Sequence, residues 1–242
     1  MFKVWIDAGH GGKDPGAVAN GIQEKNVALG LSLDIKKRLE AEYEGVQVLL
    51  SRSTDVFLEL RDRTSKANAA GADILISIHC NAGGGKGGFE TFRYTSASQN
   101  SIKLQDALHK AIMGKVGGID RGQKAQNLHM VRESKMPAVL TENLFVDVAV
   151  DADRLKKASV IDAIIDGHVF GIASYLGLAA KKTDTAKPED GVTAIVNGER
   201  IEGAVLKDGT VLIPLRAAGD NIKGAKIDWD QKTKTATLNT PQ

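Results

Sequence analysis

Lys3-Val4-Trp5-Ile6-Asp7-Ala8, followed by Gly9-His10-Gly11-Gly12, is the stretch from which the fold of this chain can be worked out. The first six residues form a short β-rich run, and the glycines beside His10 remove side-chain bulk and let a ligand or substrate approach the backbone. Similar runs return at residues 46–52 and 73–79, separated by helical patterns at residues 26–42 and 61–70. This alternation predicts an α/β domain with a mainly parallel sheet and helices on both of its faces.

The alternation continues to about residue 178. After a glycine-rich stretch, the predicted elements are a strand at 89–94, a helix at 100–115, strands at 128–132 and 138–144, and a last helix at 153–176. The helix at 26–42 carries apolar residues at steps of four, namely Val27, Leu31, Ile35 and Leu39. One apolar stripe of this kind is typical of a helix that packs on a sheet.

Length and composition exclude several classes of protein. The 242 residues are 42% hydrophobic, enough for one domain of ordinary size and a small second one. Lys and Arg exceed Asp and Glu by only 32 to 30, so we expect no nucleic-acid partner. The single Cys80 excludes an internal disulfide framework.

The first residues reach charged side chains too soon for the apolar region of a signal peptide. No apolar run approaches the roughly 18 residues of a membrane span. We therefore expect synthesis in the cytoplasm without a signal peptide, and no integral membrane contact.

Residues 179–191 contain no large apolar side chain and are predicted to be a linker between a domain at 1–178 and a small α+β module at 192–242. In the module, Asn197-Gly198 and Asp208-Gly209 are hairpin turn signals. Residues 214–222 are a short helix candidate, and residues 225–229 and 234–238 are predicted strands.

Three predicted strands end in a side chain that can bind a metal or carry a proton. Alternation along a strand gives Ile6, Ala8 and His10 one direction, and the same holds for the row that ends in His79 and the row that ends in Glu142. Ligands of open α/β sheets gather beyond the carboxyl ends of the strands. Glu24 falls just before the helix at 26–42, where the helix dipole favours a carboxylate.

A hydrolytic zinc site needs nitrogen and carboxylate ligands, an open position for water, and a further carboxylate that moves the proton. His10, Glu24, His79 and Glu142 together match that requirement. Taken singly, Glu24 fits a first-turn helix acid and His79 fits a hydrogen-bonded core histidine. A carboxylate at Glu142, which ends a buried apolar strand, needs a partner to offset its desolvation.

Other reactive side chains are assigned ordinary roles. Cys80 should point away from His79 and be a small buried residue. Residues 83–88 lack the Lys-Ser/Thr of a phosphate loop and are interpreted as a flexible rim of the site. His109 and His168 fit helical surface or packing positions, and His129 is a weaker candidate for substrate contact.

These residues resemble the zinc-dependent N-acetylmuramoyl-L-alanine amidases that include phage endolysins and bacterial sporulation and autolysis enzymes. The resemblance covers about residues 2–178. It is carried by several segments in order, namely Asp7-Ala8-Gly9-His10-Gly11-Gly12, Glu24-Lys25-Asn26, Ser51-Arg52-Ser53-Thr54-Asp55, Leu60-Arg61-Asp62-Arg63, Ser77-Ile78-His79-Cys80-Asn81-Ala82 and Pro137-Ala138-Val139-Leu140-Thr141-Glu142-Asn143-Leu144-Phe145.

The resemblance implies one zinc ion per chain, bound by His10, Glu24 and His79, with Glu142 as the catalytic acid and base. The implied substrate is peptidoglycan, cut at the amide between N-acetylmuramic acid and L-alanine. The chain departs from the family pattern in two places. After Glu142, where the family commonly has a small glycine and then a Ser-Asn pair, it has Asn143-Leu144-Phe145-Val146-Asp147. It also has Cys80 in place of the usual alanine.

The module at 192–242 resembles the small stalk domain at the N-terminus of copper amine oxidases. The matching segments are Val196-Asn197-Gly198, Leu212-Ile213-Pro214-Leu215-Arg216 and Ile227-Asp228-Trp229-Asp230. Our hypothesis is that the module holds the enzyme on the cell wall, and self-association is the alternative.

The sequence thus predicts a lytic amidase, namely a phage or prophage endolysin that reaches the wall after release through a holin pore or by lysis. A zinc peptidase that acts within stem peptides and a wall-binding protein without activity are the two alternatives. A purely structural zinc site would be closed by four protein ligands, whereas three are apparent here.

Overall fold

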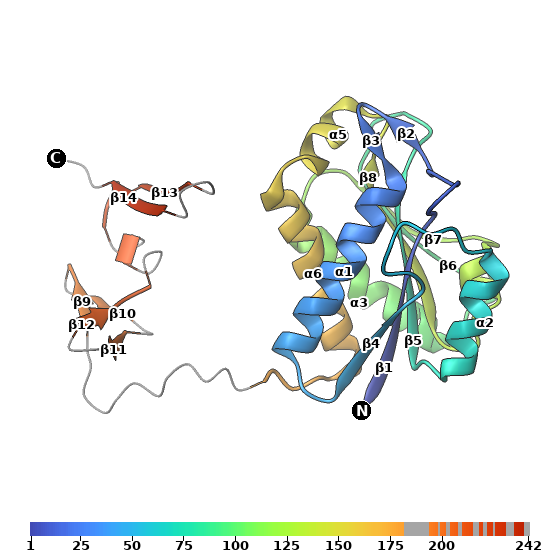
Figure 1. The fold of residues 1–242 in the computed structure, drawn as a ribbon, viewed down its shortest axis with the longest axis horizontal. Coiled ribbons are helices and arrows are strands. Elements are labelled where there is room, and N and C mark those ends of the chain that lie inside the picture. The colour runs from blue at the N-terminus through green and yellow to red at the C-terminus, as the bar shows by residue number, and fades with distance from the viewer. Residues whose placement is uncertain are drawn as a thin grey trace. The chain divides into compact units, whose positions relative to one another are not determined.

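The computed structural model describes residues 1–181, 194–197, 199–201, 204–207, 210–214, 218–219, 222–224, 226–230 and 235–239. The chain divides into two units, Met1–Lys181 and Lys182–Gln242 (Figure 1).

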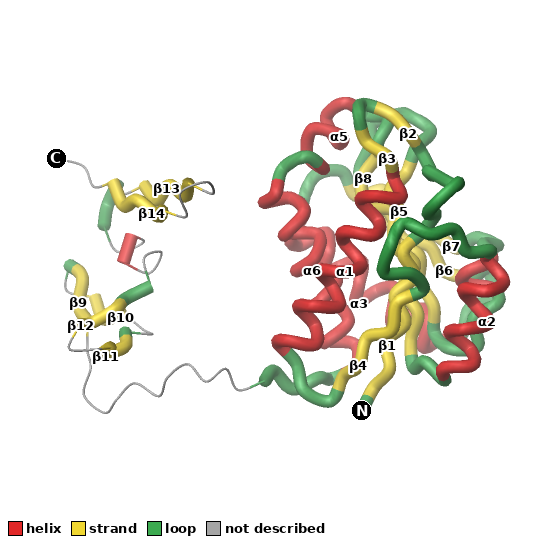
Figure 2. Tube along the Cα trace, in the orientation of Figure 1, coloured by secondary structure: helices red, strands yellow, loops and turns green. Residues whose placement is uncertain are grey.

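The first unit is built on a six-stranded sheet with the strand order β4-β1-β5-β8-β6-β7. Figure 2 shows its strands between helices on two sides. Its strands are β1 (Phe2–Ala8), β4 (Val46–Leu50), β5 (Ile74–Asn81), β6 (Phe89–Arg93), β7 (Asp120–Ala125) and β8 (Ala138–Phe145). β1 pairs in parallel with β4 and β5, and β5 pairs in parallel with β8. Only the pairing of β6 with β8 is antiparallel within this sheet. The prediction of a mainly parallel sheet is confirmed.

Helices cover both faces of the sheet, as predicted, and α2 lies on the opposite side from α1, α3 and α6 (Figure 1). They are α1 (Glu24–Glu42), α2 (Leu60–Ala70), α3 (Gln99–Val116), α4 (His129–Arg132), α5 (Ala149–Leu155) and α6 (Ala158–Leu176). The larger core lies under α1, α3 and α6 and contains Ile6, Ile76 and Val139. A smaller core with Trp5 and Leu140 lies under α2 and α4. Strand residues therefore alternate between two cores, which explains why the strands are apolar almost throughout.

The helix α1 begins at Glu24, two residues earlier than predicted, after the short hairpin of β2 (Val18–Ala19) and β3 (Ile22–Gln23). Leu31, Ile35 and Leu39 of the predicted stripe are buried in the larger core. Glu24 is thus the first residue of the helix rather than a residue that precedes it.

One predicted strand is a helix in the structure. The strand predicted at 128–132 is the short helix α4, in which the neighbours Met130 and Val131 are both buried. A strand would send neighbouring side chains to opposite faces, so only a helical turn buries both on one side. The actual edge strand, β7, has mostly polar residues and carries no apolar alternation that could reveal it.

The helix predicted at 153–176 is two helices, α5 and α6, because Lys157 has an extended backbone between them. By length and composition, α6 is apolar enough to cross a membrane, contrary to our expectation that no segment approaches a span. Its buried residues, among them Ile164, Val169 and Ile172, belong to the larger core. Packing in the larger core therefore accounts for the buried apolar face of α6.

Two glycines let α6 approach α3 closely. A Cβ atom at Gly167 would lie 2.5 Å from the Cα of Ile112, and one at Gly171 would lie 3.0 Å from the Cα of Leu108. We expect Gly167→Ala to destabilise the unit by about 1–3 kcal/mol because backbone has to move. Gly114→Ala is the matched control, since a Cβ there meets nothing within 4 Å. It should stabilise by up to about 1 kcal/mol. Urea unfolding of both variants measures the difference, and equal stability would contradict the close packing.

The second unit contains three antiparallel strand pairs among its described residues. They are β9 (Ala194–Val196) with β10 (Glu199–Ile201), β11 (Val205–Lys207) with β12 (Thr210–Leu212), and β13 (Lys226–Asp230) with β14 (Thr235–Asn239). Val196 lies opposite Glu199, as a two-residue turn at Asn197-Gly198 requires. Gly198, the turn at Asp208-Gly209 and part of the helix candidate at 214–222 lie outside the described residues.

The first residues of the predicted linker belong to the first unit. Glu44 donates its N–H to Ala179, and Lys181 donates its N–H to Glu42. The remaining linker residues, 182–191, lie outside the described part of the chain.

Candidate metal centre

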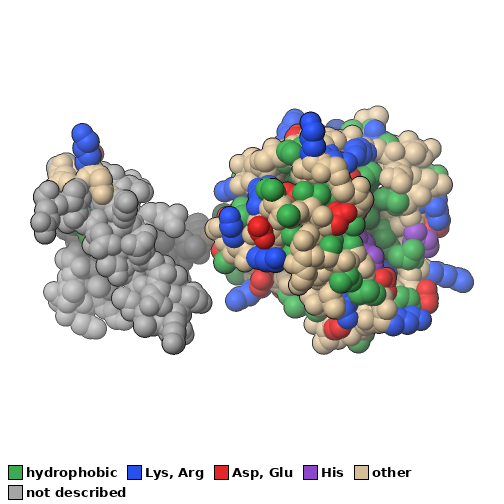
Figure 3. All heavy atoms as spheres, turned by 90° about the horizontal axis from the view of Figure 1, so that it is seen from above, with side chains coloured by type: hydrophobic (Ala, Val, Ile, Leu, Met, Phe, Trp, Pro, Cys, Tyr) green, Lys and Arg blue, Asp and Glu red, His purple; other side chains and the backbone are tan. Residues whose placement is uncertain are grey.

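The four side chains singled out in the sequence lie at one edge of the sheet. His10 follows β1, His79 is near the end of β5, Glu142 lies in β8, and Glu24 opens α1. Figure 3 looks from above onto the edge where the parallel strands end, and histidine side chains reach the surface there. The chain runs from β1 to β4 on one side and later returns to β5 on the other side of β1. Such a switch in strand order opens a crevice in α/β sheets.

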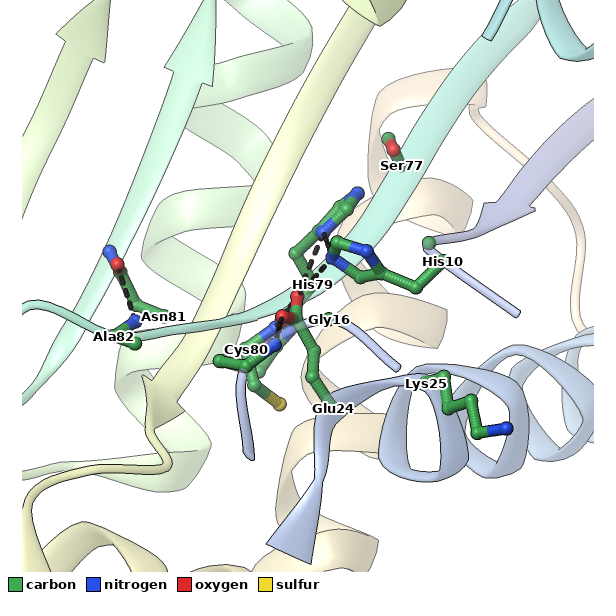
Figure 4. Close-up of polar contacts among 12 residues, drawn as sticks. His10, Gly16, Glu24, Lys25, Ser77, His79, Cys80, Asn81 and Ala82 are labelled. Atoms are coloured by element: carbon green, nitrogen blue, oxygen red, sulfur yellow. Dashed lines mark hydrogen bonds and ion pairs between the residues drawn. The ribbon is translucent and has the colours of Figure 1, made fainter. Parts of the chain in front are cut away.

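His10, Glu24 and His79 point toward one another (Figure 4). Oε1 of Glu24 lies 3.1 Å from Nε2 of His10 and 2.9 Å from Nδ1 of His79, and these two nitrogens are 3.2 Å apart. Within the described residues, this is the group of three metal-ligating side chains that could hold an ion. The three atoms form a nearly equilateral triangle.

This triangle fits zinc. Tetrahedral zinc with ligand distances of about 2.0–2.1 Å separates its ligand atoms by about 3.3 Å, close to the distances observed. Two imidazoles and one carboxylate are also a donor set that catalytic zinc sites use. The three residues could therefore hold a metal, and their assignment as ligands stays a prediction.

His10 reaches the cluster by a different route from the one predicted. Trp5 pairs with Leu75 and Asp7 with Ser77, so the row of Ile6 and Ala8 faces the other side of the sheet from the row of His79. β1 ends at Ala8, and His10 has a φ of +59° in the left-handed region. The expected alternation from Ala8 to His10 was wrong, because this left-handed turn redirects the imidazole toward His79.

Close backbone contacts support the cluster. A Cβ atom at Gly9 would lie 2.4 Å from the His79 ring, and one at Gly16 would lie 2.6 Å from the Glu24 carboxylate. The backbone N–H of Cys80 donates to Oε1 of Glu24, and that of Ala17 donates to Oε2. The glycines thus make room for the ligand candidates, and the amides fix the carboxylate.

Asp14 holds the far side of the His10 ring, with Oδ2 at 2.9 Å from Nδ1. A carboxylate on the outer nitrogen orients an imidazole and fixes its tautomer at metal sites. The sequence pattern did not predict this role of Asp14.

Charge in the cluster is arranged to receive a cation. Burial alone would lower the pKa of His10, but Glu24 and Asp14 outweigh it and raise that pKa to about 9. Burial opposes ionisation of Glu24, yet its hydrogen bonds to His10 and His79 hold its pKa well below the ordinary value. For His79 the same balance of burial against Glu24 raises the pKa. A metal ion would take the place of the protons that these nitrogens otherwise bind.

Glu142 lies beside the cluster without belonging to it. It pairs in register with His79 across β5 and β8, which places both side chains on the same face. Its Oε2 is buried and makes no hydrogen bond in the structure. Burial, together with the carboxylates of Glu24 and Glu90, raises its pKa to about 7 against the opposing effect of His79. A carboxyl group with this pKa can both accept and return a proton near neutral pH.

Sequence reasoning missed a second carboxylate. Glu90 lies directly opposite Glu142 in the antiparallel pair of β6 and β8, and its side chain is buried. It accepts hydrogen bonds from Asn81 Nδ2, Arg121 Nε and Lys124 Nζ. The signal was available, because an acid inside an apolar strand is the same feature that singled out Glu142.

A buried ion pair supports the base of the site. Nη1 of Arg63 donates to Oδ1 of Asp7 at 2.9 Å and to the Ala8 carbonyl, and Nη2 donates to the His10 carbonyl. Both side chains are almost fully buried. Arg63 therefore connects α2 to the turn that carries His10.

The remaining candidates take structural places. Cys80 is buried in the larger core, as expected. His168 is buried between Ile164 and Thr141, and burial lowers its pKa to about 4. His109 is buried between Thr91 and Asp120. His129 bonds to Thr64 of α2.

The glycine stretch at 83–88 connects β5 to β6, and its ends bond to Asp147 and Asp151. Leu144, within the segment that departs from the family pattern, has a φ of +70°, which lies in the left-handed region that favours glycine.

The fold and the site define an α/β protein that gathers two histidines and two glutamates at the carboxyl edge of its sheet, an arrangement suited to metal-assisted hydrolysis. Residues 4–174 match the N-acetylmuramoyl-L-alanine amidase family. The chain belongs to this family, and it is a peptidoglycan amidase. The family predicted from the sequence is thereby confirmed.

Similar proteins agree with this assignment. The endolysin of Bacillus phage SPP1 is 49% identical over 203 residues, which cover 80% of this chain and 74% of that protein. The sporulation-specific N-acetylmuramoyl-L-alanine amidase of Bacillus subtilis is 45% identical over 186 residues, covering 77% and 72%. The catalytic domain of CwlV, an amidase from Bacillus (Paenibacillus) polymyxa, superposes with a TM-score of 0.70 at 35% identity, covering 74% of this chain and all of that domain.

Proposed function

We propose that this amidase holds one zinc ion with His10, Glu24 and His79 and hydrolyses the amide between N-acetylmuramic acid and L-alanine. The observation that carries the proposal is the triangle of two ring nitrogens and one carboxylate oxygen, all within 4.8 Å of one another. The unpaired, buried Oε2 of Glu142 beside it supports a proton-transfer role for that residue.

Zinc, when bound, polarises a carbonyl and lowers the pKa of water. Glu142 takes a proton from the water that attacks the scissile carbonyl, because its pKa of about 7 leaves much of it ionised at neutral pH. As the carbon–nitrogen bond breaks, the same carboxyl group gives the proton to the departing nitrogen, so that L-alanine leaves as a neutral amine. Asp14 keeps the His10 ring in place through its outer nitrogen during these steps.

The products identify the bond that is cut. Mass spectrometry of peptidoglycan treated with the enzyme should find free stem peptides that begin with L-alanine. Shortened stems still attached to sugar would replace this proposal with a peptidase. Bound zinc without any product would favour a wall-binding protein.

Removing the metal should abolish turnover. We expect chelator-treated protein to lose activity and to regain it with added zinc, with one zinc per chain measured by elemental mass spectrometry. His79→Ala should fail to regain it, because one of three ligands is missing. His129→Ala is the control, since His129 lies outside the cluster and should keep both metal and activity. Full turnover by metal-free protein would contradict the zinc assignment.

We infer that the enzyme acts on the cell wall as a lytic enzyme of the endolysin kind. The similarity to the SPP1 endolysin supports this role, and the similarity to the sporulation enzyme supports a bacterial alternative. Expression in a host separates the two: an endolysin should cause lysis only when a pore opens the membrane. A sporulation role would show as a defect in spore formation when the gene is deleted.

The second unit carries a separate proposal, namely that residues 192–242 hold the enzyme on the wall. The resemblance to stalk domains supports it. Deletion of residues 182–242, which leaves the first unit intact, should reduce sedimentation with purified walls. Unchanged sedimentation together with a change in oligomeric state would favour self-association instead.

A further inference from the structure

A cationic cluster lies on one flank of the candidate centre. Arg121 and Lys124 of β7 both contact the buried carboxylate of Glu90, which also accepts a hydrogen bond from Asn81. Their side chains are 30% and 39% exposed, whereas that of Glu90 is 4% exposed. The two cations therefore reach solvent while the acid between them does not.

Arg121 and Lys124 carry more positive charge than the carboxylate of Glu90 neutralises. One carboxylate faces two cations, so one positive charge is left over. Among the described residues, Nη2 of Arg121 makes no hydrogen bond, although Nε and Nη1 are bonded to Glu90 and Gly87. The Arg121 guanidinium also lies over the Phe145 ring at 4.6 Å from its centroid, which restrains its orientation. A held guanidinium with a free edge suits a carboxylate ligand.

The cluster lies two strands away from Glu142. Glu142, Glu90 and the two cations occupy the consecutive strands β8, β6 and β7. Two strand spacings are about 10 Å, and the long side chains of β7 reach back toward Glu90. A peptide spans at most about 3.6 Å per residue, so a group on the residue after L-alanine lies about 7 Å from the scissile carbon.

The side of the candidate centre away from β7 is lined by side chains of a different kind. A cavity of about 300 Å³ there is lined by the apolar Phe57, Leu58 and Leu60 and by the acids Asp14 and Glu59, next to His10 and His79. The one cation in its lining, Arg63, is neutralised by its buried partner Asp7, so the remaining charge is acidic. Acids repel a carboxylate, so an anionic part of the substrate is favoured on the β7 side. This asymmetry orients the stem peptide toward β7 and the uncharged sugar toward the cavity.

We propose that Arg121 and Lys124 form a subsite that binds a free carboxylate on the residue following L-alanine in the stem peptide. The inference rests on the proposed amidase function and adds a specificity determinant to it. Glu90 is the positioning residue of this subsite, because it holds both cations at the edge of the sheet.

The test compares two soluble substrates, N-acetylmuramoyl-L-Ala-γ-D-Glu-L-Lys and its analogue in which the glutamate α-carboxylate is an amide. For zinc-loaded wild type we expect kcat/KM to favour the carboxylate form about tenfold, the scale of one charge-assisted hydrogen bond. Lys124→Met and Arg121→Gln should each reduce this preference to about twofold. Lys110→Met is the control, since Lys110 pairs with Asp106 on α3 and should keep the full preference.

A ratio between substrates separates recognition from a general loss of folded enzyme. If Lys124→Met and Arg121→Gln lose kcat/KM equally on both substrates, or if wild type does not prefer the carboxylate form, the subsite is overturned while the amidase proposal stays intact. Hydrolysis of neither substrate by zinc-loaded wild type would instead overturn the proposed function. Calorimetry of the same two substrates binding to the Glu142→Gln variant gives the same comparison without turnover. Equal affinities for the two substrates would also overturn the subsite.

Discussion

Replacing Glu142 with glutamine is expected to lower turnover on peptidoglycan about a thousandfold, because glutamine cannot accept the proton of the attacking water. The metal content should not change, since Glu142 is not one of the three residues of the ligand triangle. Release of stem peptides and elemental analysis of the same preparation measure both quantities.

The stability of this variant provides a second test. The buried Oε2 of Glu142 makes no hydrogen bond, so replacing the acid with a neutral amide should leave the unfolding temperature unchanged or raise it. Glu133→Gln is the control, because Glu133 is an exposed partner of Arg132 and should keep full activity. Wild-type turnover by Glu142→Gln would remove this residue from the mechanism.

Arg63→Met is expected to destabilise the first unit by about 3–5 kcal/mol, the usual cost of leaving one member of a buried ion pair alone. The variant leaves Asp7 buried without its cation and removes the hydrogen bonds that Arg63 donates to the carbonyls of Ala8 and His10. Arg61→Met on the same helix is the matched control, since Arg61 is exposed and should change stability by less than about 0.5 kcal/mol. Denaturant unfolding measures both variants. A loss in Arg63→Met as small as in the control would contradict a supporting role for the pair.

The pair also predicts a dependence on pH. Burial alone raises the pKa of Asp7, but Arg63 and the Ser77 hydroxyl hold it below its ordinary value of 3.8. A folded pKa below the unfolded one means that the stability is present above about pH 4 and is lost as the pH falls through the folded pKa. In Arg63→Met, burial should raise the pKa of Asp7, so protonation removes the lone charge. The difference in stability between wild type and variant should therefore shrink as the pH is lowered from neutral, and a constant difference would contradict the assignment.

Much of the fold follows from local patterns. The apolar runs of β1, β5 and β8 and the stripe of α1 are visible in the sequence because these elements are buried between two cores. β7 and α4 are not visible in the sequence, because a polar edge strand has no apolar periodicity and a single helical turn is too short to show one. The break between α5 and α6 depends on the backbone of Lys157 rather than on any helix-breaking residue.

Residue type and spacing were enough to predict the family, the main strands in their order along the chain and the side chains that could bind a metal, because these are local properties. How those side chains meet depends on contacts between distant segments. His10 turns toward His79 through a left-handed backbone that no alternation rule anticipates, and Glu90 faces Glu142 through a strand register that joins residues about fifty positions apart. The left-handed turn is stabilised by contacts such as that of Arg63 with the His10 carbonyl, and the register is set by pairing between distant strands. Neither is encoded in the neighbouring residues, which is why the site is assembled by the fold.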